Sequence, residues 1–329
     1  MQKPSNLLIK VARRLFENED EQTQFINALF APQPFFPCIL WCQEKPDVSP
    51  FLLETPTPWQ PEFIDRLHLN EKPGQHSLHQ EGYFYCLDFS SVFAASPLLT
   101  IQQPISMIFD MCAAPGGKSI FAWKALKPNL LISNEVIGKR LGMLISNLKR
   151  CQIQPSCVVN RDPSIFAESF TKSSDLVIVD APCTGQSLLA KGGKAPGCFH
   201  HTSINKSANR QKRIMANSAQ VVAPQGYLLY MTCTYSPEEN EQVCEWFLEK
   251  FSQFKAVKIE HLSNYQSHLT DLYCYRMFPH QRLGAGAFTA LFKNTEDGEV
   301  NTGNIDTILA MNKYVQGINE SSYWISTHN

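Results

Sequence analysis

Apolar residues are spaced differently in the first hundred residues and in the two hundred that follow. Between Pro4 and Phe30 they recur at helical intervals, for example at Leu8, Val11 and Leu15, and this spacing predicts helix. The next segment is rich in proline, which interrupts long helices, so we expect short strands and turns there. Its prolines are Pro32, Pro34, Pro37, Pro46, Pro50, Pro56, Pro58 and Pro61. Residues 1–100 are therefore predicted to form a small N-terminal α+β domain.

From residue 105 onward, short apolar strands alternate with amphipathic helices. Strands are predicted at 106–110, 130–133, 157–160, 176–179 and 227–231, and helices at 117–127, 138–151 and 204–222. Such alternation predicts a parallel sheet built by right-handed crossovers. In these sheets a ligand binds at the carboxyl ends of the strands. We assign 101–294 to this α/β domain and 295–329 to a polar C-terminal extension, with a weak helical pattern at 305–314.

Composition limits the classes of protein and the location. The 329 residues are 43% hydrophobic, enough for one large domain and a smaller one. The formal net charge of -1 argues against a basic coat, so a nucleic-acid surface would have to be local. The first twenty residues lack a signal-peptide pattern, and no apolar run reaches about 18 residues, so neither secretion nor a membrane span is expected. The 11 cysteines form no Cys-x-x-Cys pair, which favours the reducing cytoplasm.

The loop after the first strand of the α/β domain has the composition of a ligand-binding loop. Residues 110–119 read Asp-Met-Cys-Ala-Ala-Pro-Gly-Gly-Lys-Ser. Small residues allow the backbone to approach a ligand closely, and the helix that follows offers free N–H groups. Cys112 stands where a phosphate-binding P-loop requires glycine, and the dinucleotide pattern Gly-x-Gly-x-x-Gly is missing too. A plain turn between strand and helix would need only one glycine.

Acidic residues follow three successive strands of this domain. They are Glu135, Asp162 and Asp180. An acid after the second strand is placed to accept hydrogen bonds from a ribose diol. Taken singly, each of these acids is more often a turn or helix-cap residue. Their recurrence at strand ends favours a cofactor site.

Two cysteines are predicted at the same edge of the sheet. Cys183 follows Asp180 in Asp-Ala-Pro-Cys, and Cys233 lies in Thr-Cys-Thr-Tyr-Ser-Pro-Glu-Glu-Asn-Glu. A single cysteine is more often a small buried apolar residue, but a pair beside an acid indicates reactive thiols. In the second block Ser236 is predicted to cap a helix, with Glu239 completing a capping box. A helix N-terminus near Cys233 would lower the pKa of its thiol.

The blocks together resemble the family of bacterial ribosomal and eukaryotic nucleolar RNA cytosine-5 methyltransferases. They lie at 110–119, 180–185 and 232–241, with a fourth at 278–288 that contains Phe-Pro-His and Gly-Ala-Phe. The similarity covers about residues 81–293, and the Pro-Cys and Thr-Cys pairs in this order are its most specific part. The family usually has glutamine where Leu87 stands and phenylalanine where Ala287 stands, which bears on the shape of the substrate pocket.

This resemblance implies a Rossmann-like S-adenosylmethionine-dependent (class I) methyltransferase domain, with the N-terminal domain orienting the substrate. Carbon 5 of cytosine is a weak nucleophile, so the chemistry calls for a covalent adduct. By resemblance Cys233 is the nucleophile, Cys183 assists release of the product, and Asp180 holds the cytosine edge. Lys118 reaches into the same site. The resemblance assigns the cofactor to Cys112, Ala113, Ala114, Pro115, Gly116, Gly117, Lys118, Glu135, Asp162 and Asp180.

The RNA surface is predicted from local charge. Residues 191–213 contain no acid, and Lys206, Arg210 and Arg213 share one helix face. With Arg140 they are the candidate RNA-binding residues, although a solvated helix face is the plain alternative. No metal is expected, because the histidines at 200 and 201 lack a partner pair at zinc spacing.

The resemblance favours 16S ribosomal RNA as the substrate, with transfer RNA as the alternative. The oligomeric state stays open, and a monomer is the plain expectation. Three other functions compete with RNA methylation: a nicotinamide-dependent dehydrogenase, a non-catalytic RNA-binding factor of ribosome assembly, and a methyltransferase that acts on DNA. The missing glycine fingerprint disfavours the first, and the paired cysteines disfavour the second. An adduct on Cys183 instead of Cys233 would favour the third.

Overall fold

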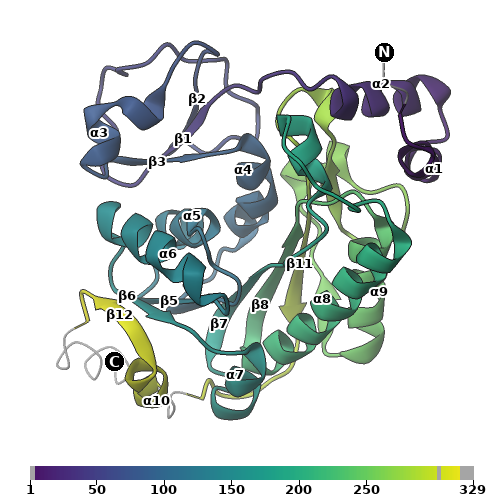
Figure 1. Cartoon of the computed structure of the whole chain (residues 1–329). Helices are drawn as coiled ribbons and strands as arrows, with labels where there is room; N and C mark the ends of the chain where they lie inside the picture. Colours follow the sequence, from purple (N-terminus) through teal and green to yellow (C-terminus); the bar gives the residue numbers. More distant parts are fainter. Residues whose placement is uncertain (1–3, 302–304, 319–329) are drawn as a thin grey trace.

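A large mixed sheet forms the centre of the molecule in the computed structural model, which describes residues 4–301 and 305–318 (Figure 1). Its strand order is β10-β11-β8-β7-β4-β5-β6-β12. The parallel strands are β4 (Met107–Asp110), β5 (Leu130–Asn134), β6 (Ser156–Val159), β7 (Ser174–Asp180) and β8 (Val222–Thr232). The antiparallel strands are β9 (Phe254–Ala256), β10 (Tyr275–Met277), β11 (Ala287–Asn294) and β12 (Asn312–Gln316). The predicted parallel strands are therefore present, with antiparallel strands added on both sides.

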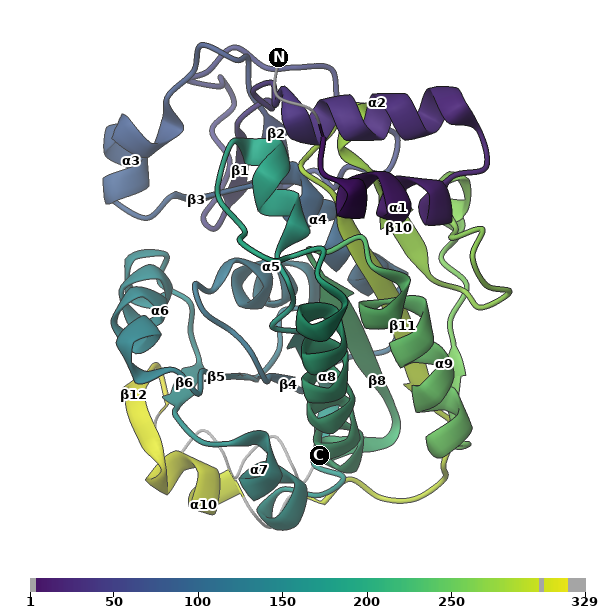
Figure 2. The ribbon, with the colours of Figure 1, turned by 45° about the vertical axis from the view of Figure 1, so that its right-hand side comes forward.

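Helices cover both faces of this sheet, as the turned view shows (Figure 2). One face carries α4 (Phe89–Ala95), α5 (Gly117–Leu126) and α6 (Gly138–Arg150). The other carries α7 (Pro163–Ser169), α8 (His201–Val221) and α9 (Glu241–Lys250). Successive strand residues alternate between the two apolar clusters, so that Ile108 packs on the first face and Phe109 on the second. This alternation follows from the two-residue period of a strand.

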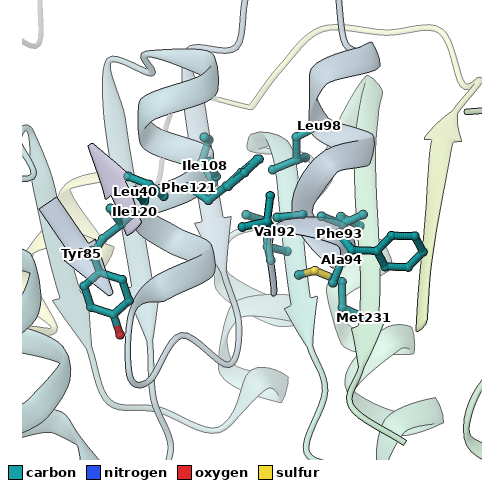
Figure 3. Packing of buried hydrophobic residues seen from close by; sticks show 14 of the residues in the cluster. Leu40, Tyr85, Val92, Phe93, Ala94, Leu98, Ile108, Ile120, Phe121 and Met231 are labelled. Atoms are coloured by element: carbon teal, nitrogen blue, oxygen red, sulfur yellow. The ribbon is translucent and has the colours of Figure 1, made fainter. Parts of the chain in front are cut away.

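A small antiparallel sheet lies over α5 and α6 (Figure 1). It has the order β2-β1-β3, with β1 (Cys38–Trp41), β2 (Ile64–Arg66) and β3 (Phe84–Leu87), and α3 (Ser77–Gln80) precedes β3. Its inner face shares one apolar cluster with the large domain, in which Leu40 and Tyr85 lie near Phe121 of α5 (Figure 3). Helix α5 is thus packed between the small sheet and the large sheet.

The helical pattern at the N-terminus forms two helices. They are α1 (Asn6–Leu15) and α2 (Glu19–Phe30), and the side chain of Asn18 caps the second. Both helices pack in a cluster with Tyr235 and Phe278, which is separate from the cluster of the small sheet. The N-terminal hundred residues therefore contact the large domain at two separate places.

The short 3₁₀ helices are η1 (Pro73–Gln75), η2 (Ser96–Thr100), η3 (Gln186–Lys191), η4 (Pro237–Glu239), η5 (Glu260–Tyr265) and η6 (Pro279–Gln281). In the C-terminal extension the weak helical pattern forms only α10 (Ile305–Ala310), and the strand β12 that follows was missed. Residues 302–304 and 319–329 of this predicted extension lie outside the described residues. Within the described part of the chain, no helix is long and apolar enough to cross a membrane.

Candidate active site

The strand order of the large sheet changes direction between β4 and β7: β5 and β6 follow on one side of β4, and β7 and β8 follow on the other. The carboxyl ends of these parallel strands lie at one edge of the sheet. A crevice forms at such a point because the connections on its two sides diverge to opposite faces of the sheet. Every predicted catalytic residue lies on a segment that leaves one of these strand ends, or on α5, which follows β4. The predicted edge of the sheet is therefore the edge at which the side chains meet.

The loop after β4 is held from below by a buried carboxylate. Asp110 is fully buried and accepts hydrogen bonds from Ser119 Oγ at 2.6 Å and from the Cys112 N–H at 3.1 Å. Burial raises the pKa of Asp110 to about 7. Gly116 has a φ of 111°, in the left-handed region that disfavours side chains. The loop consequently turns tightly into α5 and leaves the first N–H groups of the helix free for a ligand.

Gly117, the first residue of α5, is closely approached by a side chain of the small sheet. A Cβ atom at this position would lie 3.1 Å from Cε1 of Tyr85, which comes from β3 of the small sheet. The aromatic ring thus lies directly against the helix N-terminus. The small sheet therefore fixes the position of the loop that was predicted to hold the cofactor.

The three predicted acids differ in their surroundings. Glu135 is buried, accepts a hydrogen bond from the Ile137 N–H at 2.8 Å and lies 3.0 Å from the Arg140 guanidinium. Asp162 caps α7 by accepting a hydrogen bond from the Ser164 N–H, and it pairs with Arg213 at 3.1 Å. The role of helix cap, which was the alternative to a cofactor-binding role for this acid, is therefore present. The Asp162 side chain is also 40% exposed, which leaves it open to a ligand.

The two cysteines lie side by side. Their Sγ atoms are 3.3 Å apart, with Cys233 exposed and Cys183 half-buried. Next to them Nζ of Lys118 contacts Oδ2 of Asp180 at 2.8 Å. Burial opposes the charge of Lys118, but the carboxylate of Asp180 outweighs it and raises the pKa of Lys118. The site therefore combines two thiols with an ion pair.

The protons of the two thiols are distributed unequally. The pKa of Cys233 is lowered to about 7, and the largest cause is the hydrogen bond from Cys183. The charge of Lys118 also lowers this pKa, whereas burial and the charge of Asp180 raise it. The same hydrogen bond, together with burial, raises the pKa of Cys183. Cys233 is thus the thiol that ionises near neutral pH, while Cys183 keeps its proton and donates it.

The predicted capping box at Ser236 is wrong. The hydroxyl of Ser236 caps nothing; residues Pro237–Glu239 form the separate turn η4, and α9 begins only at Glu241. The backbone of Asn240, at φ -116° and ψ -96°, interrupts the helix. Glu239 is consequently free to accept hydrogen bonds from Thr184, across the crevice.

The predicted RNA-binding residues fall into two groups. Lys206 and Arg210 are exposed on α8. Arg140 and Arg213 are instead paired with the predicted cofactor acids Glu135 and Asp162, and Arg140 also donates to the carbonyl of Ala114 in the loop. Contact with RNA therefore stays a prediction for all four residues.

Sequence reasoning missed Asp110 and Glu239 as residues that organise the site. Both stand inside the blocks that were singled out, but their partners are not visible in the spacing of the chain. In the same region the ring of His200 caps α8 through the Thr202 N–H. Across the described residues, no group of three or more His, Cys, Asp or Glu side chains is placed to hold a metal ion.

The order of the parallel strands, the antiparallel β11 beside β8 and the glycine-containing loop before α5 define a class I, S-adenosylmethionine-dependent methyltransferase fold. Residues 98–293 match the family described as 16S rRNA methyltransferase RsmB/F. The chain belongs to this family. The resemblance seen in the sequence blocks is thereby confirmed.

Curated relatives carry the same description. The chain is 33% identical over 244 residues to ribosomal RNA small subunit methyltransferase F of Vibrio cholerae. The matched segment covers 72% of this chain and 51% of that protein. The protein of the same name from Pectobacterium carotovorum is 28% identical over 200 residues, 60% of this chain and 41% of its own. The chain thus spans about half the length of the curated relatives that it matches.

Solved structures with the same fold come from Pyrococcus horikoshii. A methyltransferase homolog protein has a TM-score of 0.68 at 20% identity and covers 88% of this chain and 99% of its own. The structure of NSun6 with SFG has a TM-score of 0.68 at 19% identity, and the match covers 89% of this chain and 99% of that protein. At this identity the similarity shows the fold.

Proposed function

We propose that this chain methylates carbon 5 of a cytosine in ribosomal RNA, with 16S ribosomal RNA as the substrate, through a covalent adduct on Cys233. The observation that carries the proposal is the contact between Cys183 and Cys233, whose sulfur atoms lie 3.3 Å apart beside the Lys118–Asp180 ion pair. Neither a dehydrogenase nor a simple binding protein needs two such thiols at the ligand edge of the sheet.

The residues of the loop fit S-adenosylmethionine, which supplies a methyl group as an electrophile. Gly116 and Gly117 let the backbone of residues 112–118 approach a ligand, and the N-terminus of α5 offers N–H donors. Glu135 at the end of β5 has the position from which an acid accepts hydrogen bonds from a ribose diol. Asp162 and Asp180 would complete the site.

The cysteines and their neighbours supply the remaining chemistry. The Cys233 thiolate adds to carbon 6 of the cytosine, which makes carbon 5 nucleophilic. Asp180 holds the N3/N4 edge of the base, and Lys118 balances its charge. After methylation a base takes the proton from carbon 5, and the bond between Sγ and carbon 6 breaks with its electron pair returning to the sulfur of Cys233, while Cys183 assists release. The cytosine has to leave its stack to enter such a pocket, and Lys206 and Arg210 are exposed on α8 to contact phosphates.

The test follows tritiated methyl transfer from S-adenosylmethionine into total RNA of a strain that lacks the gene, with bisulfite sequencing of the product. One new protected cytosine in 16S ribosomal RNA supports the proposal, and one in transfer RNA corrects the substrate. Absence of transfer into naked RNA and into ribosomal subunits, although the cofactor binds, would instead indicate a factor of ribosome assembly.

The roles of the cysteines are tested with two variants. Cys233→Ala should abolish both transfer and the adduct, because it removes the nucleophile. Cys183→Ala should accumulate a protein–RNA complex that resists denaturation, because release is impaired. Equal behaviour of the two variants contradicts the assigned roles, and an adduct that forms on Cys183 would point to chemistry of the DNA-modifying type.

A further inference from the structure

A fully buried carboxylate lies between the loops that carry the two cysteines. Glu239 is 0% exposed, and its oxygens accept four hydrogen bonds. On the side of Cys183 they come from the Thr184 N–H at 2.9 Å and the Thr184 hydroxyl at 2.5 Å. On the side of Cys233 one comes from the Thr234 hydroxyl at 3.3 Å, and Gln211 of α8 donates the last at 3.0 Å. One side chain thus joins three segments.

The partners of Glu239 flank the cysteines in sequence. Thr184 directly follows Cys183 and Thr234 directly follows Cys233, and their hydroxyl oxygens are 2.9 Å apart. Gln211 also donates to the carbonyl of Pro182 at 3.2 Å. The residues on both sides of Cys183 are therefore linked to Glu239, Thr184 directly and Pro182 through Gln211.

We propose that Glu239 is a positioning residue, which acts through Thr184 and Thr234 to hold the sulfur of Cys183 against the sulfur of Cys233. Its consequence for catalysis rests on the function proposed above, but the positioning itself can be measured without RNA. The alternative function for Glu239, a capping role in α9, is already excluded by the geometry of η4.

A carboxylate suits this position better than an amide. An ionised carboxylate only accepts hydrogen bonds and has room for about four of them, which matches the donors that surround Glu239. In Glu239→Gln one oxygen becomes an NH₂ group that faces other donors. In addition, the negative charge of Glu239 adds to the hydrogen bond and burial that raise the pKa of Cys183, so that Cys183 stays the protonated partner.

The distance between the sulfurs can be tested by oxidation of the full-length chain. Diamide removes two electrons and two protons from a pair of thiols, becomes the hydrazine, and leaves a disulfide. The rate at which Cys183 and Cys233 become linked is followed by mass spectrometry of their peptides. We compare the wild type with Glu239→Gln and with Glu238→Gln, a matched neighbour that pairs with Arg14 outside this network.

We expect the wild type and Glu238→Gln to form the disulfide at the same rate, and Glu239→Gln at least about tenfold more slowly, because a small displacement of paired groups lowers their effective concentration steeply. In methyl transfer, kcat should fall in Glu239→Gln while the KM for RNA stays unchanged. If no variant methylates RNA, the proposed function fails but the oxidation rates still decide the positioning.

A second variant covers the case in which Glu239→Gln does not fold. Thr184→Val with Thr234→Val removes both hydroxyl links at nearly constant volume and leaves Glu239 in place. This folded variant should also form the disulfide several-fold more slowly. Wild-type rates of oxidation in either folded variant would overturn the proposal.

Discussion

Replacing Cys183 should shift the ionisation of Cys233 to higher pH. With a pKa of about 7, Cys233 is half thiolate at pH 7. At its ordinary pKa of 9.0 only about 1% would be thiolate. Cys183→Ala removes the hydrogen bond that contributes most to this lowering, so the reactivity of Cys233 at pH 7 should fall by up to about 50-fold. Cys183→Ser keeps a hydrogen-bond donor at this position, so the reactivity of Cys233 at pH 7 should fall less than in Cys183→Ala.

The assay is alkylation of Cys233 by iodoacetamide from pH 5.5 to 9.5, measured on its peptide under reducing pretreatment. Because the pKa of Cys233 is lowered, its thiolate is present above about pH 7 and is lost as the pH falls through 7. In Cys183→Ala the curve of alkylation rate against pH should therefore shift to higher pH. Lys118 and Asp180 act on Cys233 in opposite directions and are unchanged. Cys86→Ala, at a half-buried cysteine of β3, is the control. An unchanged midpoint in Cys183→Ala would refute the reasoning.

Two further predictions concern the buried pair behind the site and the cofactor loop. Arg276→Met leaves Glu241, its buried partner, without a charged partner and should lower the free energy of unfolding in urea by about 3–5 kcal/mol. Lys258→Met removes one member of an exposed pair, whose charges the solvent screens, and should leave the free energy of unfolding almost unchanged; equal losses in the two variants would contradict this. Gly116→Ala forces a side chain to a φ of 111° at about 1–3 kcal/mol, so calorimetry should show S-adenosylhomocysteine binding weakened about tenfold or more. Gly142→Ala, which meets nothing within 4 Å, should bind it normally; equal affinities would argue against the loop as the cofactor site.

The N-terminal region has two structural roles around this site. The small sheet positions Tyr85 against the start of α5, and α1 and α2 pack on Tyr235 and Phe278. Tyr235 follows Cys233 by two residues, and its N–H donates to Gln186 of the other cysteine loop at 2.8 Å. Both contacts involve residues next to predicted site residues in the sequence. Substitutions in the N-terminal region should therefore change the positions of the predicted site residues.

The sequence alone determined the parallel strands of the large sheet and the edge at which the candidate site residues gather. Strands and helices are encoded in apolar spacing over a few residues, and the carboxyl ends of parallel strands must meet at one edge. For this reason the loop at 112–118, Glu135, Asp180 and both cysteines could be assigned to one site, and the structure brings Cys183 to 3.3 Å from Cys233.

Only the tertiary structure decided which partners the charged residues of the site take. Arg140, a predicted RNA-binding residue, lies 3.0 Å from Glu135. Glu239 was predicted to cap a helix and instead joins the two cysteine loops. The strand β12 pairs with β6 far from it in sequence. Such contacts depend on which loops fold next to each other, and the spacing of residues along one segment contains no information about the donors that another segment brings to it.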